Sequence, residues 1–293
     1  MDLLSMIDLP PDAWCDKYYQ GGEYLKAADA VWGIRSSVYS AIAIRHVVAL
    51  RAGEPYLTLW PYHWRLLMAE LPRIGVNAIE FTTSEALRQE IWLLATRNRY
   101  PANSLIHIVI WQEQKSCGTA LRHALFQSRM SRALFDCDPR KALRLAPPSE
   151  YGIVGGNAGA WSETSIEALA QRSAEEAGLD GACLQLANGR IARATVGNIF
   201  FLLQGGCVVG SSLGTRPDAL CDYVREKGLW ERLRLKYEEM EGIPQSVIYE
   251  ALECFVCDAA LGLQPVLSVG TDKRFMRISS IKFAEELRRM TSL

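Results

Sequence analysis

The sequence has almost no net charge, because 32 lysines and arginines are offset by 33 aspartates and glutamates. A chain without a basic excess has no electrostatic footprint for nucleic acid or for an anionic membrane surface. Its apolar runs are also too short to span a bilayer as a helix. We therefore expect neither nucleic acid nor a membrane as a partner.

The eight cysteines are scattered, and their spacing fits neither a disulfide framework nor a zinc site. Only Cys254 and Cys257 lie close together, and no second pair stands at zinc-ligand spacing. The opening residues MDLLSMIDLPPD lack the basic region and the apolar core of a secretion signal. These features favour reduced thiols in a cytoplasmic protein that binds no metal.

The residues that are present predict a mixed α/β chain. A length of 293 residues exceeds what one small core needs, and 49% hydrophobic and 22% charged residues are ordinary for a globular protein. Asn-Gly and Gly-Gly pairs between apolar runs predict two hairpins in the second half. Apolar periodicity and capping residues predict helices over 62–74, 83–98, 162–178 and 215–228, whereas the basic residues 116–149 read as a loop.

Four segments, in order, carry a resemblance to a known family. They are HWRLLMAELPRIGV (63–76), AEEAGLDGACLQLANGRIARATVGNIFFL (174–202), SLGTRPDAL (212–220) and ECFVCDAALGLQPV (253–266). They resemble the class IV aminotransferases, the fold-type IV pyridoxal-phosphate enzymes that include branched-chain and D-amino-acid aminotransferases and aminodeoxychorismate lyase.

The resemblance implies a two-domain α/β fold and a homodimer that acts on a small metabolite. The expected division is a small N-terminal α/β domain over 1–128, a linker over 129–149, and a larger C-terminal domain with a pseudo-barrel sheet over 150–293. In the family, a lysine forms a Schiff base with pyridoxal phosphate and a glutamate partners the pyridine nitrogen. An arginine, threonines and the amides at a helix start hold the phosphate.

The lysine that the resemblance requires is absent from its expected place. Its position falls on Ile153, or on Ala158 in a shifted alignment, and no lysine occurs between Lys141 and Lys227. Neither isoleucine nor alanine can form an imine, so covalent catalysis of the family's kind is excluded at that position.

Three further positions depart from the family, while two keep its residue types. The pyridine glutamate falls on Arg193, whose permanent charge would repel a pyridinium. The phosphate arginine falls on Leu66, beside Arg65, and the threonine falls on Ala259. Only Thr215 and Arg216, at a predicted helix start, are retained. From these departures we expect a protein that uses no cofactor. The alternatives are a misaligned lysine position, a relocated lysine such as Lys115 or Lys141, or non-covalent binding of the cofactor.

A pocket that survived these changes would hold a small anionic metabolite. Arg193 and Arg216 suit a carboxylate or phosphate, and Asp258 and His107 can move protons. Four candidates have a structural alternative: Arg193 and Asp258 pair to seal a collapsed pocket, His107 is a core histidine, and Cys257 is a buried small hydrophobe. The candidate catalytic residues are Arg193, Asp258 and His107; the candidate substrate-binding residues are Arg216, Thr215, Tyr151, Asn157 and Cys257.

Three functions follow from the sequence. The first is a cofactor-independent metabolic or biosynthetic enzyme acting on a small carboxylate, such as an amino acid, a keto acid or a chorismate-like acid. The second is a non-catalytic pseudoenzyme or partner subunit. The third is a genuine pyridoxal-phosphate-dependent aminotransferase or lyase with a relocated lysine. Because replacing a glutamate by Arg193 inserts a charge, which decay seldom favours, the sequence favours the first.

Overall fold

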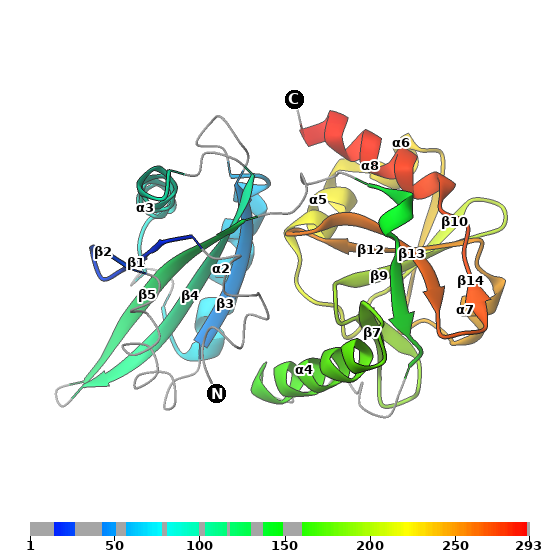
Figure 1. The fold of residues 1–293 in the computed structure, drawn as a ribbon, viewed down its shortest axis with the longest axis horizontal. Coiled ribbons are helices and arrows are strands. Elements are labelled where there is room, and N and C mark those ends of the chain that lie inside the picture. Colours follow the sequence, from blue (N-terminus) through cyan, green and yellow to red (C-terminus); the bar gives the residue numbers. More distant parts are fainter. Residues whose placement is uncertain are drawn as a thin grey trace. The chain divides into compact units, whose positions relative to one another are not determined.

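The structure, a computed structural model, describes residues 15–26, 43–50, 57–77, 81–99, 103–115, 118–129, 137–148 and 160–291. The chain divides into two compact units, Met1–Leu134 and Phe135–Leu293. Each unit has its own sheet (Figure 1). Within the described residues, no helix is long and apolar enough to cross a membrane.

The first unit is an antiparallel sheet with helices on one face. The five strands lie in the order β2-β1-β5-β4-β3, and β4 and β5 form a long hairpin (Figure 1). The strands are β1 (Lys17–Gln20), β2 (Glu23–Lys26), β3 (Ala43–Leu50), β4 (Ser104–Lys115) and β5 (Gly118–Arg129), and the helical segments are α2 (Trp60–Glu70), η3 (Leu71–Ile74) and α3 (Ser84–Arg97).

The alternation of apolar residues along β4 explains how the first unit packs. Ile106, Ile108 and Ile110 point to one face of the sheet and form a core with α2 and α3. On α3, the expected face is buried (Leu87, Ile91, Leu94 and Ala95), and the Thr83 side chain caps the helix by accepting from the Ala86 amide.

The second unit is built on a larger, curled sheet. Its main path runs β11-β10-β9-β12-β13-β6-β7-β8, with β14 paired to β13. Hydrophobic residues of β9, β12 and β13 line the core. The strands are β6 (Leu143–Ala146), β7 (Gly181–Gln185), β8 (Ile191–Ala194), β9 (Asn198–Leu203), β10 (Cys207–Ser211), β11 (Lys236–Met240), β12 (Glu253–Asp258), β13 (Gly262–Val269) and β14 (Lys273–Arg274).

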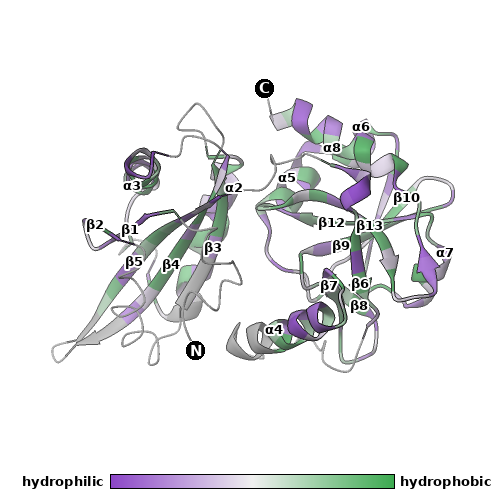
Figure 2. Ribbon diagram, viewed as in Figure 1, coloured by the Kyte–Doolittle hydropathy of each residue, from purple (hydrophilic) through white to green (hydrophobic). Residues whose placement is uncertain are grey.

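Helices cover this sheet, and an aromatic cluster fills one interface. Phe255 of β12 stacks on Phe200 and meets Trp230 and Phe283 edge-on or tilted. Figure 2 shows α8 alternating between hydrophobic and hydrophilic residues, as expected of a helix with one face on the core. The helical segments are η5 (Pro139–Lys141), α4 (Ala160–Glu176), α5 (Ala219–Lys227), α6 (Leu229–Arg232), α7 (Ser246–Glu250) and α8 (Ile278–Thr291).

The predicted hairpins are confirmed, but several local expectations are wrong. The turns at Asn188–Gly189 and Gly205–Gly206 connect β7 to β8 and β9 to β10. In contrast, the expected loop over 116–149 contains β5 and β6. The helix expected to be capped at Ser162 already begins at Ala160, and Asp218, rather than Pro217, lies at the start of α5.

The turn between β8 and β9 is pressed against β12. Gly197 has a φ of +143°, and a Cβ there would lie 2.7 Å from the Cys257 carbonyl oxygen. Only glycine tolerates this backbone at such a close approach. The turn therefore fixes the ends of β8 and β12 beside each other, and these ends carry Arg193 and Asp258.

Candidate functional site

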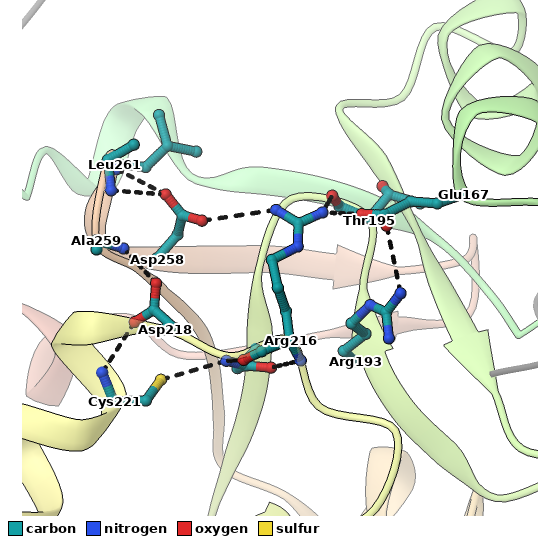
Figure 3. Close-up of polar contacts among 11 residues, drawn as sticks. Glu167, Arg193, Thr195, Arg216, Asp218, Cys221, Asp258, Ala259 and Leu261 are labelled. Atoms are coloured by element: carbon teal, nitrogen blue, oxygen red, sulfur yellow. Dashed lines mark hydrogen bonds and ion pairs between the residues drawn. The ribbon is translucent and has the colours of Figure 1, made fainter. Parts of the chain in front are cut away.

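Two arginines from different elements converge on one carboxylate in the second unit. Arg193 lies on β8, and Arg216 lies in the segment leading to α5. The Arg193 Nη2 donates to Glu167 Oε2 at 3.3 Å, and Arg216 Nη2 contacts Glu167 Oε1 (Figure 3). Because Glu167 comes from α4, three segments distant in sequence meet at this ionic cluster.

The backbone of Arg216 is fixed by the side chain of Asn198. The Asn198 amide nitrogen donates to the Arg216 carbonyl at 2.8 Å, and its oxygen accepts from the Arg216 amide at 2.9 Å. From this anchor the Arg216 side chain reaches the Thr195 carbonyl at 3.2 Å and approaches Asp258 Oδ2 at 3.7 Å. Figure 3 shows the guanidinium lying between Asp258 on one side and Glu167 on the other.

Two aspartates, Asp218 and Asp258, accept hydrogen bonds from backbone amides near the start of α5 and at the end of β12. Asp218 accepts from the Cys221 amide at 2.8 Å and from the Ala259 amide at 2.7 Å. Asp258 accepts from the amides of Ala260 and Leu261 at 2.8 and 3.0 Å. These four N–H groups are of the kind that bind a phosphate or carboxylate at a helix start or a tight turn.

Burial and a neighbouring charge act on the protonation of Asp218. Removal from water, together with the nearby Asp258 carboxylate, raises the pKa of Asp218 to about 7, against the lowering effect of the two amides. The Cys221 thiol has a raised pKa because it is hydrogen-bonded to Cys257, is partly removed from water and faces Asp218. Cys221 is therefore a thiol rather than a thiolate at neutral pH.

The structure brings together some of the predicted site residues. Arg193, Arg216 and Asp258 belong to the ionic cluster, Thr215 is exposed next to Arg216, and Cys257 is buried beside Cys221. The sealing pair expected between Arg193 and Asp258 is replaced by Arg193 with Glu167 and Asp258 with Arg216.

Other predicted residues lie elsewhere or outside the described part of the chain. His107 is in the first unit, buried on β4, with Nε2 2.8 Å from the Ser128 hydroxyl. Leu66 is also in the first unit, half-buried on α2. Tyr151 and Asn157, with the positions Ile153 and Ala158, lie outside the described residues.

Sequence reasoning missed three residues of the cluster. Glu167 carries no local signal, because its role depends on α4 lying against the sheet. Asp218 carried a local signal in the sequence, since an aspartate immediately before an apolar helix is a typical N-capping residue. Asn198 served only as a marker of the resemblance, although it fixes the Arg216 backbone.

The fold matches solved branched-chain aminotransferases. The enzyme from Thermobaculum terrenum in its PLP (pyridoxal phosphate) form has a TM-score of 0.77 at 15% identity, with 95% of this chain and 94% of that chain covered. The enzyme from the archaeon Thermoproteus uzoniensis with norvaline has a TM-score of 0.78 at 18% identity, covering 94% and 95%. A further branched-chain aminotransferase, solved with pyridoxamine 5'-phosphate, has a TM-score of 0.75 at 16% identity, covering 95% of both chains.

The chain thus has the fold-type IV aminotransferase fold that the resemblance implied. No protein-family model matches the sequence, and no curated protein matches it either. The expectation that the protein uses no cofactor is wrong: the solved proteins that share its fold were captured with pyridoxal phosphate and pyridoxamine phosphate, which point to pyridoxal phosphate. The sequence favoured a protein without the cofactor because four of the family's positions are substituted and only Thr215 and Arg216 are retained.

Proposed function

We propose that this protein is a pyridoxal-phosphate-dependent enzyme of small amino and keto acids, the third of the functions that the sequence allowed. The observation that carries the proposal is the likeness of fold over nearly the whole chain to aminotransferases solved with that cofactor. Related solved complexes contain norvaline and 4-methylvaleric acid, an amino acid and a simple carboxylic acid.

The donors near α5 suit the phosphate of such a cofactor. Arg216 and the hydroxyl of Thr215 stand at the helix start, and the amides of Ala259, Ala260 and Leu261 lie at the neighbouring β12–β13 turn. Cationic and N–H donors of this type bind phosphate strongly. In the structure, the amides donate to Asp218 and Asp258, so these carboxylates must yield when the phosphate binds.

The ring end and the covalent link fit less well. When bound, pyridoxal phosphate supplies an electron-withdrawing ring to the amino acid. Arg193 cannot protonate a pyridine nitrogen, although it can donate a hydrogen bond to an unprotonated one. No lysine lies between Lys141 and Lys227. A covalent link would therefore need a lysine from outside that stretch.

Titration with pyridoxal phosphate, followed by absorbance, tests this proposal. The wild-type protein is expected to bind saturably, and Arg216→Ala to bind at least about 10-fold more weakly, because the charge-assisted contact to the phosphate is lost. The matched control is Arg225→Ala, which removes an arginine from α5 that pairs with Glu239. Equal affinities for the three proteins would place the cofactor elsewhere and contradict the assignment.

The assembly and compartment belong to the same proposal. We infer a homodimer, from the sequence resemblance, and a cytoplasmic location, which the scattered cysteines favour. Seven cysteines in the described residues are free thiols. Light scattering coupled to size exclusion would measure the mass in solution, and a monomer at micromolar concentration would contradict the dimer.

A further inference from the structure

Glu167 forms an ion pair with each of the two arginines of the site. Its two carboxylate oxygens are divided between the partners, Oε2 to Arg193 and Oε1 to Arg216. The side chains of Glu167 and Arg193 are 17% and 5% exposed, so water screens their pair weakly. A carboxylate in this position has the charge and the planar geometry that an anionic ligand would present to the same guanidinium groups.

The two arginines differ in how far their side chains are exposed to solvent. The Arg193 Nη1 donates to the Gly214 carbonyl at 2.6 Å, which holds the buried guanidinium in place. Arg216 is 39% exposed: Asn198 holds its backbone, and its guanidinium contacts Glu167 from the solvent-facing side of the pair. Arg216 is therefore the member of the pair that an incoming ligand can reach.

The charges around the Arg216 guanidinium decide what a ligand must displace. Glu167 faces it from α4, Asp258 approaches from the end of β12 at 3.7 Å, and the Thr195 carbonyl lies at 3.2 Å. Arg193 adds positive charge from β8 behind Glu167. Since Glu167 is the carboxylate shared by both cations, its removal takes an anionic partner from Arg193 and from Arg216 at once.

We propose that Glu167 is a built-in counter-ion that sets the affinity of this site, because an anionic ligand must take over its contact with Arg216. This inference rests on the proposed function for the ligand class, a phosphate-bearing or carboxylate-bearing molecule. Glu167 thereby acts as a positioning residue: it keeps Arg216 extended across the site when no ligand is bound, and it competes with the ligand for the guanidinium.

Replacing a glutamate of α4 by the uncharged glutamine tests whether Glu167 is the counter-ion. Affinities for inorganic phosphate and for pyridoxal phosphate are measured by calorimetry at fixed ionic strength for wild type, Glu167→Gln and Glu176→Gln. Glu176 also lies on α4 but is exposed and pairs with Arg172 at 3.0 Å, so its variant removes the same charge away from the site. Because the competing charge is lost, Glu167→Gln is expected to bind both probes at least about 10-fold more tightly than wild type, and Glu176→Gln to match wild type.

The outcomes separate this inference from the proposed function. Tighter phosphate binding by Glu167→Gln, with no binding of pyridoxal phosphate to any variant, would support the role of Glu167 as a counter-ion. The same result would contradict the proposal that the protein binds pyridoxal phosphate. Wild-type binding of pyridoxal phosphate with Glu167→Gln no tighter than Glu176→Gln would overturn the counter-ion alone. If thermal unfolding shows that Glu167→Gln does not fold, Glu167→Asp decides: the shorter side chain loosens the contact, so tighter binding than wild type supports the inference and equal or weaker binding overturns it.

Discussion

Replacement of Phe255 by alanine is expected to lower the free energy of unfolding of the second unit by about 3–5 kcal/mol. Phe255 is fully buried on β12 and stacks on Phe200 with ring centroids 5.6 Å apart and an interplanar angle of 13°. It also meets Phe283 edge-on, with centroids 5.4 Å apart. Alanine removes the apolar burial and the aromatic contacts together and leaves a cavity that this packed interface cannot close.

Chemical denaturation followed by tryptophan fluorescence measures this loss, since Trp230 lies in the same cluster. The matched control is Tyr249→Ala, because Tyr249 is an aromatic residue of the same unit that is 65% exposed. The control should change the free energy of unfolding by less than about 0.5 kcal/mol. A loss below about 1 kcal/mol for Phe255→Ala would mean that the cluster is not packed as described.

The second large effect concerns the dependence of stability on pH. In the folded protein, burial and the Asp258 charge raise the pKa of Asp218 to about 7, whereas an aspartate in the unfolded chain has a pKa of about 4. Between these values the folded state binds more protons than the unfolded state. The free energy of unfolding therefore falls as the pH rises from about 4 to about 7, by roughly 1 kcal/mol per pH unit from this group, and its contribution is constant above that range.

Asp218→Asn removes this contribution, so the difference in unfolding free energy between wild type and variant should change steadily across that range. Comparing slopes rather than absolute values matters, because the two amides donate to different oxygens of Asp218, and asparagine places an NH2 donor where one of these oxygens was. Asp222→Asn is the control, because it removes a carboxylate of the same helix that pairs with Arg225 instead. Parallel curves for wild type and Asp218→Asn would show that Asp218 is ionised throughout.

Local signals in the sequence predicted those parts of the fold that depend on neighbouring residues. The apolar face of α3 and the Asn188–Gly189 turn could be predicted because periodicity and turn chemistry act within a few residues. The strand β5 could not, because Arg122 and Arg129, among the basic residues of 116–149, suggested a solvated loop. Its pairing with β4 along its whole length is a long-range interaction that decides its conformation.

The candidate site shows the same division. The resemblance located Arg193, Arg216 and Asp258, and the structure places all three in one cluster. Their partners could not be predicted from the sequence. Pairing with Glu167 requires α4 to pack against the sheet, and this long-range packing leaves no signal in the residues next to Glu167 or Arg193. The inference that four substitutions abolish cofactor use was wrong for a related reason, since it judged each position separately and not the fold as a whole.

The absorbance spectrum of the purified wild-type protein with added pyridoxal phosphate tests the central claim most directly. We predict a saturable spectral change that is weakened in Arg216→Ala; borohydride reduction and intact mass would then tell whether a lysine is linked to the cofactor. A spectrum equal to the sum of the free protein and the free cofactor, at concentrations of both up to the millimolar range, would contradict the claim that this fold binds pyridoxal phosphate here.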